Sequence, residues 1–235
     1  MLLVSSNTHI RRSDEVMIGN ERTFPEFTLP DVSEVDDPEH SEIDEIQRIA
    51  EEAPYRLKWP KVSVTKLHTD EISYEMFLDL ISSDLYDIIH YSGHGYADST
   101  NNFMFFWKGK NKTGPIVALD ANLLAKVLEK ARNLQFIYLS CCQGAATETG
   151  YKRHLNRFVG LLDPIVSAGV PIALGMRWPL SAHNSKSFSG SFYKALFLDK
   201  GIDSIEHALA KARSEAFTYS DRSVWCSPIL VKQVS

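Results

Sequence analysis

The sequence predicts an α/β fold in which a mostly parallel sheet carries helices on both faces. Apolar and β-branched runs alternate along the chain with segments of helical periodicity, the order that parallel strands and crossover helices produce. The chain has 235 residues, of which 44% are hydrophobic, so it can bury the core of one large α/β domain. No internal repeat or linker interrupts the pattern, and we expect a single domain over residues 1–235.

The first hundred residues predict three strands and two helices. Residues 1–6 are a short apolar run typical of a buried strand, and residues 41–53 place isoleucines at helical spacing. Residues 61–68 alternate and are rich in β-branched side chains, which predicts a second strand, and a short helix is expected at 73–83. Residues 86–95 are an apolar run that ends in glycines, so we expect a third, buried strand followed by a tight turn.

A polar segment separates the first strand from the first helix. Residues 10–40 contain three prolines and many polar side chains, which predicts a long loop that is mobile or gates a site. Residues 31–52 hold ten acidic side chains and one arginine, a segment charge of −9 within a total of −5, which leaves +4 for the rest. We interpret the segment as a solvated acidic loop and helix face, with autoinhibition or docking of a partner as the alternative.

The second half of the chain predicts three more strands and four helices. Apolar runs at 134–140, 170–178 and 224–233 predict strands, and the last is expected at a sheet edge because Pro228 has no N–H to donate. The aromatic run 103–107 predicts an additional strand or hairpin arm. Helical periodicity recurs in the remaining segments: 119–131, 156–169, 182–199 and 204–217.

Composition argues against several classes of function. No stretch interleaves basic and aromatic residues, so direct binding of nucleic acid is not predicted. The three cysteines, Cys141, Cys142 and Cys226, are odd in number and lack the spacing of a zinc site, which indicates a reducing, cytoplasmic compartment and no metal or other cofactor. No apolar run approaches the roughly 20 residues of a membrane span, so we expect no membrane partner.

Two of the predicted strand ends carry reactive side chains. His94 lies between two glycines in SGHG at the end of 86–95, and Cys141 and Cys142 follow the strand 134–140 in SCCQG. Function in open α/β sheets gathers at the carboxyl ends of strands, and if these two strands are neighbours, an imidazole meets a thiol there. Because successive strand residues face opposite ways, one cysteine at most should point at the crevice while the other packs against a helix.

These motifs resemble the CHAT proteases of the caspase, separase and gingipain clan. YDIIHYSGHG is similar to the strand that carries the clan's histidine, and SCCQG fits the C-[RQG]-G part of the caspase signature with Cys142 as the cysteine and its histidine 48 residues upstream. FVGLLDPIVSAGVPIALGMRWPL and VWCSPILV are similar to the next helix and strand and to the closing strand. The resemblance covers about residues 60–235. It implies a caspase-like three-layer sandwich around a six-stranded sheet.

The resemblance also implies a mechanism and the residues that perform it. Cys142 is the nucleophile that attacks a peptide carbonyl, and His94 is the general base and acid. The backbone N–H groups of Gly95 and Cys142 form the oxyanion hole. Asp98 is a candidate for orienting the imidazole, with a backbone carbonyl as the alternative.

Other residues near these strand ends are candidates for support and specificity. His90 shares a strand face with the catalytic histidine by parity, and we interpret it as a packing residue that supports the site. Glu148, beside Thr147, and Arg177 lie where the clan builds its specificity pocket. Arg177 favours an acidic substrate side chain and Glu148 a basic one, and a salt bridge between them is equally compatible. The run 103–107 is expected to pack in the core or a hairpin, with an apolar subsite as the alternative.

The leading hypothesis is a CHAT-type cysteine endopeptidase that cleaves a specific protein by Cys–His catalysis. The presence of both His94 and Cys142 argues against the alternative, an inactive caspase-like interaction or scaffold module. The resemblance implies a gated effector in prokaryotic antiviral defence or cell death whose substrate is a gasdermin-like or regulatory protein. It also implies an activating partner or sensor, in the form of a tetratricopeptide-repeat or nucleotide-sensing subunit or domain.

Overall fold

Ten strands and six helices are present in the computed structural model, which describes residues 1–8, 10–11, 14–23, 25, 41–56, 62–97, 102–143, 159–177, 180–199, 204–219 and 224–233. The strands are β1 (Leu2–Ser6), β2 (Val16–Ile18), β3 (Glu21–Thr23), β4 (Thr65–Leu67), β5 (Ile88–Ala97), β6 (Asn102–Gly109), β7 (Thr113–Asp120), β8 (Phe136–Gln143), β9 (Ile172–Met176) and β10 (Pro228–Lys232). The helices are α1 (Glu42–Arg56), α2 (Tyr74–Ser82), α3 (Ala121–Leu128), α4 (Val159–Ser167), α5 (Ala182–Leu198) and α6 (Ile205–Tyr219).

The strands form one mixed sheet that forks at β5. The order along the sheet is β10-β9-β8-β5-β6-β7-β2-β3, and β1 and β4 lie off this path. Residues 89–93 of β5 pair in parallel with β1, whereas residues 95–97 pair antiparallel with β6. On its other side, β5 pairs in parallel with β8. β5 is therefore the strand to which the two branches of the sheet attach.

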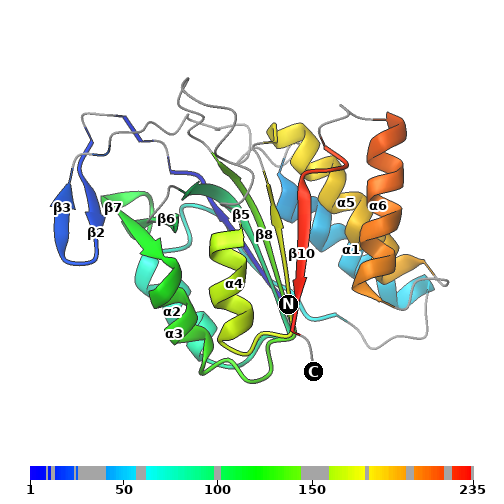
Figure 1. Ribbon diagram of the computed structural model, residues 1–235, viewed down its shortest axis with the longest axis horizontal. Coiled ribbons are helices and arrows are strands. Elements are labelled where there is room, and N and C mark those ends of the chain that lie inside the picture. Colours follow the sequence, from blue (N-terminus) through cyan, green and yellow to red (C-terminus); the bar gives the residue numbers. More distant parts are fainter. Residues whose placement is uncertain are drawn as a thin grey trace.

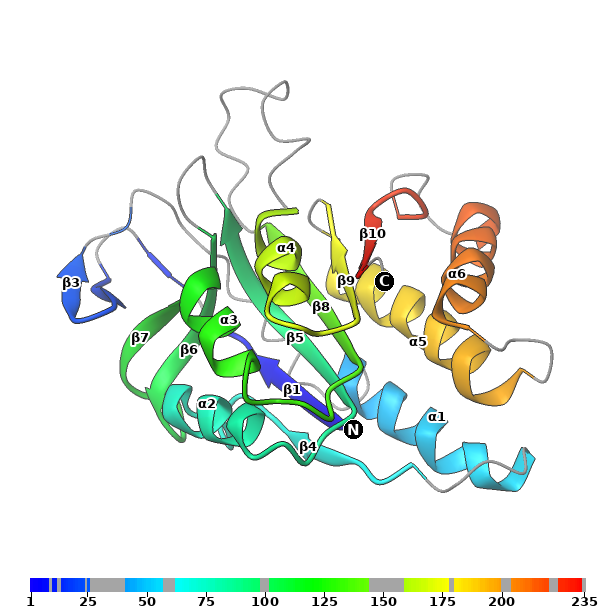
Figure 2. The ribbon, with the colours of Figure 1, turned by 60° about the horizontal axis from the view of Figure 1, so that its bottom comes forward.

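Helices cover both faces of the sheet, as Figures 1 and 2 show. The side chains of α1, α5 and α6 pack on one face, with Phe136 and Tyr138 of β8 in the same buried cluster. The side chains of α2, α3 and α4 pack on the other face, with Ile137 and Leu139 of β8. Neighbouring residues of β8 thus enter opposite cores, as the alternation of an extended strand requires. The predicted α/β class and three-layer arrangement are confirmed.

The sheet extends further than the six predicted strands, so that number was too low. The six correspond to β1, β4, β5, β8, β9 and β10, and the described residues contain four more. The aromatic run 103–107 lies in β6, which forms a hairpin with β7. The loop expected over residues 10–40 differs from the structure at 16–23, where β2 and β3 pair with each other and β2 joins β7. Strands of three residues are too short to show a hydrophobic period. Residues 26–40 lie outside the described residues.

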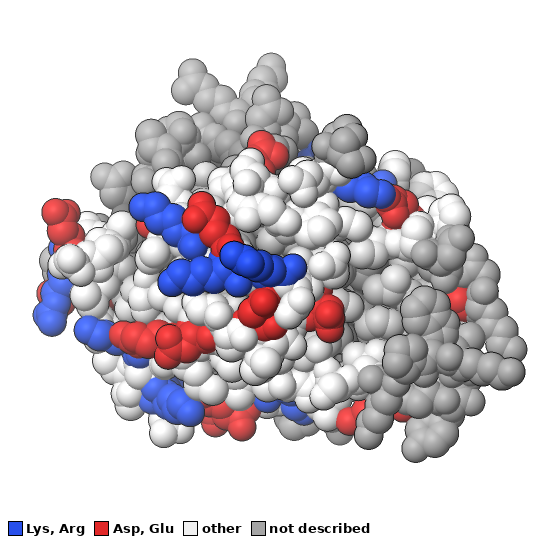
Figure 3. Space-filling view, turned by 90° about the horizontal axis from the view of Figure 1, so that it is seen from below, with Lys and Arg blue, Asp and Glu red and all other residues white. Residues whose placement is uncertain are grey.

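Charged side chains of both signs are mixed on the face seen from the end of the sheet where β1 begins. In Figure 3 the lysines and arginines that are described there alternate with aspartates and glutamates. Such mixing is typical of a solvated protein surface. In the part of the chain that the structure describes, no helix combines the length and the apolar character needed to cross a membrane.

Candidate active site

His94 and Cys142 lie at matching positions on two neighbouring parallel strands, close to their carboxyl ends. The register of β5 and β8 pairs the Cα atoms of the two residues. His94 is buried, with 3% of its surface exposed, and Cys142 is described through its backbone. The two strands are therefore neighbours, and their backbones are one interstrand spacing of about 4.8 Å apart.

The first of the two adjacent cysteines lies on the face of the sheet that α2, α3 and α4 cover. Cys141 is fully buried in the core formed with α2, α3 and α4. A Cβ atom at Gly95 of β5 would lie 3.1 Å from Cys141 Sγ, so the thiol fills the space beside that glycine. By strand alternation, position 142 falls on the face of Tyr138, whose ring packs against His90 at a centroid distance of 4.6 Å. The prediction that one of the pair packs in the core is confirmed for Cys141.

A tyrosine on the core side of β5 holds the backbone of the candidate histidine. Tyr91 Oη donates a hydrogen bond to the carbonyl oxygen of His94 at 3.0 Å. A Cβ atom at Gly93 would lie 2.7 Å from that phenol oxygen and 2.6 Å from the carbonyl oxygen of Ser6, distances that no real Cβ tolerates. The first glycine of SGHG, Gly93, is thus needed for packing.

A buried carboxylate, that of Glu42, contacts the two strand residues that precede the His94 and Cys142 positions by two on the same face of the sheet. Glu42 is the first residue of α1 and is 3% exposed. Its Oε1 accepts a hydrogen bond from Ser189 of α5 and lies 3.3 Å from His90 Nε2. Its Oε2 accepts hydrogen bonds from three more hydroxyls: Ser92 of β5 (2.8 Å), Ser140 of β8 (2.9 Å) and Ser185 of α5 (3.2 Å). We call Glu42, these four serines and His90 the Glu42 cluster.

The surroundings of Glu42 keep its carboxylate ionised. Burial raises the pKa of Glu42, but the charge of His90 and the hydrogen bonds from Ser189 and Ser92 outweigh burial and hold the pKa below its ordinary value of 4.5. Burial and the negative charge of Glu42 raise the pKa of Tyr193 well above its ordinary value, so that phenol stays protonated. Its Oη lies 3.3 Å from Nδ1 of His90. The carboxylate of Glu42 is thus ionised, and its negative charge is compensated by the side chains around it.

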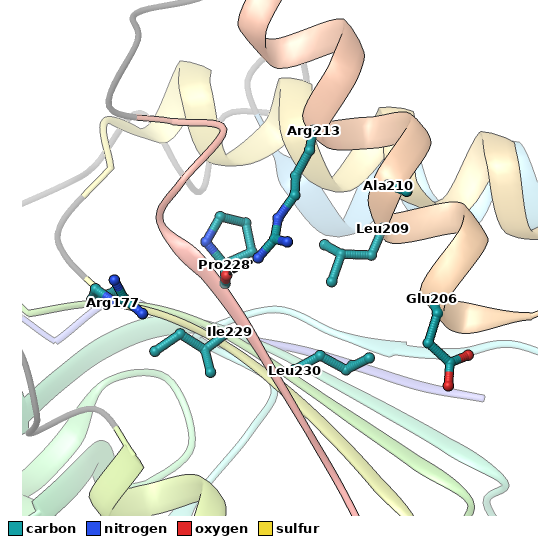
Figure 4. Close-up of a pocket in the computed structure, with 8 residues that line it drawn as sticks. All are labelled: Arg177, Glu206, Leu209, Ala210, Arg213, Pro228, Ile229 and Leu230. Atoms are coloured by element: carbon teal, nitrogen blue, oxygen red, sulfur yellow. Dashed lines mark hydrogen bonds between the residues drawn. The ribbon is translucent and has the colours of Figure 1, made fainter.

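Two arginines share a pocket beside the end of β9. Arg177 and Arg213 line a pocket of about 360 Å³ together with Glu206 and apolar residues of α6 and β10, as Figure 4 shows. Nη2 of Arg213 donates to the carbonyl oxygen of Pro228 at 2.5 Å, and the backbone N–H of Arg177 donates to that of Ser227 at 2.8 Å. Burial, and then the charge of Arg177, lower the pKa of Arg213. An anionic group bound here would offset the repulsion between the two cations.

The remaining candidates from the sequence fall in three groups. Asp98, Thr147 and Glu148 lie outside the described residues, so their roles stay predictions. Gly95 lies in β5 and has strand neighbours on both sides. The side chains of residues 103–106 in β6 are buried, which confirms core packing and not an apolar subsite.

Sequence reasoning missed the central part played by Glu42. The acidic segment 31–52 was interpreted as a solvated face, and for Glu42 this is wrong because its carboxylate is enclosed by five polar side chains. A weak signal was present in the serines Ser92 and Ser140, which interrupt otherwise apolar strands. In the described ranges, no three His, Cys, Asp or Glu side chains come together as ligands for a metal.

Comparison with known proteins places the chain in a family. Its residues 8–231 match the CHAT domain. Protein GSU0716 from Geobacter sulfurreducens is similar in structure over 100% of this chain and 94% of its own, with 12% identity and a TM-score of 0.51. Separase of Saccharomyces cerevisiae, in complex with securin, is similar over 80% of this chain and 11% of its own, with 17% identity and a TM-score of 0.44. The Drosophila initiator caspase Dronc is similar over 98% of this chain and 78% of its own, with 7% identity and a TM-score of 0.49.

No curated protein matches the sequence. Since the family match spans nearly the whole length, the chain belongs to the CHAT domain family.

Proposed function

We propose that the protein is a cysteine endopeptidase in which Cys142 is the nucleophile and His94 the general base and acid. One observation carries the proposal: the register of β5 and β8 puts these two positions side by side at the carboxyl edge of a sheet. The burial of Cys141 in the opposite core supports the choice of Cys142 over its neighbour. The membership of the CHAT family is compatible with peptide-bond hydrolysis.

The proposed reaction follows from the chemistry of a thiol beside an imidazole. His94 accepts the proton of the Cys142 thiol, and the thiolate attacks the peptide carbonyl carbon. The resulting imidazolium then protonates the leaving amine, and water hydrolyses the thioester with His94 as base. Backbone N–H groups of Gly95 and Cys142 are the proposed donors to the oxyanion.

The proposal is tested by the reactivity of Cys142 toward iodoacetamide. At pH 7 we expect Cys142 to be alkylated faster than the half-buried Cys226, because a neighbouring imidazole raises the thiolate fraction. Replacement His94→Ala should slow alkylation of Cys142 by about tenfold or more. Mass spectrometry with fragmentation of the peptide separates Cys142 from Cys141, and Cys226 serves as the reference thiol in every sample.

A second histidine variant controls for unspecific effects. His207 is exposed on α6, and His207→Ala should leave the alkylation rate of Cys142 unchanged. Circular dichroism of both variants verifies that they are folded. If Cys142 reacts no faster than Cys226, or equally fast without His94, the endopeptidase is refuted and the inactive interaction module is favoured.

We also propose that the pocket of Arg177 and Arg213 selects substrates with an acidic side chain. The pocket lies beside the end of β9, the strand next to β8, and holds two guanidinium groups. The one carboxylate among the residues that line it, Glu206, is bonded to Lys232 at 2.8 Å. The alternative, a basic preference through Glu148, stays open because Glu148 lies outside the described residues.

Cleavage profiles distinguish these two preferences. The protein is incubated with a peptide library, and kcat/KM is then measured for matched peptides that differ only in one acidic or neutral residue. Arg213→Ala should reduce the ratio of the two values by about tenfold, since a charged hydrogen-bonding partner is lost. Lys211→Ala, on the exposed side of α6, is the matched control and should leave the ratio unchanged. A wild-type preference for basic residues would contradict the acidic pocket.

A further inference from the structure

The carboxylate of Glu42 joins the two strands that end in the proposed catalytic pair. Its Oε2 accepts hydrogen bonds from Ser92 of β5 and Ser140 of β8 at 2.8 and 2.9 Å. These two serines are themselves partners in the register of the strands. A single oxygen atom thus links the two strands on the face that carries His94.

The linked serines are the residues directly below the pair on that face. Ser92 precedes His94 by two positions, and Ser140 precedes Cys142 by two positions. Side chains two apart on a strand share a face and are separated by about 7 Å. A change in the separation of Ser92 and Ser140 is therefore transmitted over one side-chain repeat to the next paired positions.

A buried carboxylate contributes little net stability to a fold compared with apolar residues of similar size. Enclosing a charge costs desolvation, and well-packed apolar residues stabilise such sites as well or better. A hydrogen-bonded buried carboxylate instead fixes the geometry of its surroundings, because each donor has one favourable position relative to the carboxylate oxygens. The Glu42 cluster has such a geometry, with four hydroxyls and His90 arranged around two oxygens.

We propose that Glu42 is a positioning residue that sets the distance between His94 and Cys142 through the hydroxyls of Ser92 and Ser140. The inference rests on the proposed function, since it assigns a support to that pair. Glu42 itself touches no substrate in this assignment. It acts through the two serines, and its effect appears in how readily the thiol of Cys142 gives up its proton to His94.

The cluster contains its own matched control. Ser185 and Ser189 also donate to the carboxylate of Glu42 and belong to α5, not to the strands of the pair, and Ser185 Oγ also hydrogen-bonds Ser140 Oγ at 2.5 Å. The double variants S92A/S140A and S185A/S189A therefore each remove two hydroxyl donors from the same carboxylate. Similar losses of thermal stability are expected for both. An effect on the reactivity of Cys142 is expected for the strand variant alone.

The readout is the pH dependence of the alkylation of Cys142 by iodoacetamide, with Cys226 as the reference thiol. In S92A/S140A we expect the rate at pH 6 to fall by about tenfold and the midpoint of the profile to move to higher pH, because a misplaced imidazole no longer supports the thiolate. In S185A/S189A the profile should stay within about twofold of the wild type. A structural role alone lowers the unfolding temperature but does not move the midpoint.

The outcomes separate the inference from the function on which it rests. If wild-type Cys142 shows no reactivity that depends on His94, the proposed endopeptidase fails. If that reactivity is present and both double variants keep the wild-type profile, or both shift it equally, the positioning role of Glu42 is overturned. Should a double variant fail to fold, the four single serine variants give the same comparison with half the loss of donors.

Discussion

Replacing Cys142 with alanine is expected to abolish cleavage of a protein substrate, with a loss in kcat of about 10³-fold or more, since a covalent step needs its nucleophile. The replacement removes the sulfur atom that is proposed to attack the substrate. Cleavage is measured by proteomic detection of new amino termini in a lysate incubated with wild-type or variant protein. The substrate sites that appear with the wild type should be missing with Cys142→Ala.

The neighbouring cysteine provides the control for this experiment. Cys141 is fully buried on the opposite face of β8, beside Gly95, and Cys141→Ala should retain much of the activity. The two variants remove the same atom from adjacent positions, so they separate a chemical role from a packing role. Cleavage that survives in Cys142→Ala but disappears in Cys141→Ala would reverse the assignment of the two cysteines.

Replacing Glu42 with alanine should produce the largest loss of stability of any single acidic substitution in α1. The change removes the ion-pair partner of His90 and one acceptor of four serine hydroxyls in the core. Removal of one partner from a buried ion pair costs about 3–5 kcal/mol in the free energy of unfolding. Urea unfolding followed by circular dichroism measures the difference, and Glu51→Ala on the exposed side of the same helix should change the free energy of unfolding by less than about 0.5 kcal/mol.

The wild type and Glu42→Ala should also differ in acid unfolding. The pKa of Glu42 is lower in the folded chain than its ordinary value of 4.5, so the carboxylate stabilises the fold at any pH above that value. This stabilisation is lost as the pH falls through the lowered pKa of the folded state. The wild type should therefore lose stability steeply below pH 4.5, whereas Glu42→Ala, already less stable at pH 7, should lose less over that interval. Equal slopes for the two proteins would contradict an ionised, stabilising Glu42.

The strands of the central sheet were predictable from sequence because their signal is local. Long apolar runs such as 86–95 and 134–140 identify β5 and β8, but the predicted ends and the tight turn after residue 95 were wrong: the strands continue to Ala97 and Gln143 and contain the glycines and cysteines. The order of these motifs also led to the CHAT family. The short strands β2 and β3 were missed because three residues within a polar segment carry no measurable period, whereas β4, equally short, lies in an alternating run over residues 61–68.

The Glu42 cluster was not predictable because its contacts are distant in the sequence. The serine donors lie 50, 98, 143 and 147 residues after Glu42. Charge patterning is a local criterion, and a glutamate among nine other acidic residues has the composition of a surface segment. Only the packing of α1 and α5 on the sheet distinguishes this carboxylate from its neighbours.

The fork at β5 has a consequence for the folding of the chain. Pairing of β5 with β8 closes a loop of 48 residues (Ile88 with Phe136), and pairing with β1 closes one of 87 residues (Leu2 with Ile89). Closure of long loops is entropically costly, and contacts of this kind slow folding. His94 and Cys142 consequently meet only after the centre of the sheet has formed. A nascent or partly unfolded chain holds the two residues far apart, so the proposed proteolytic activity is confined to molecules that have completed their fold.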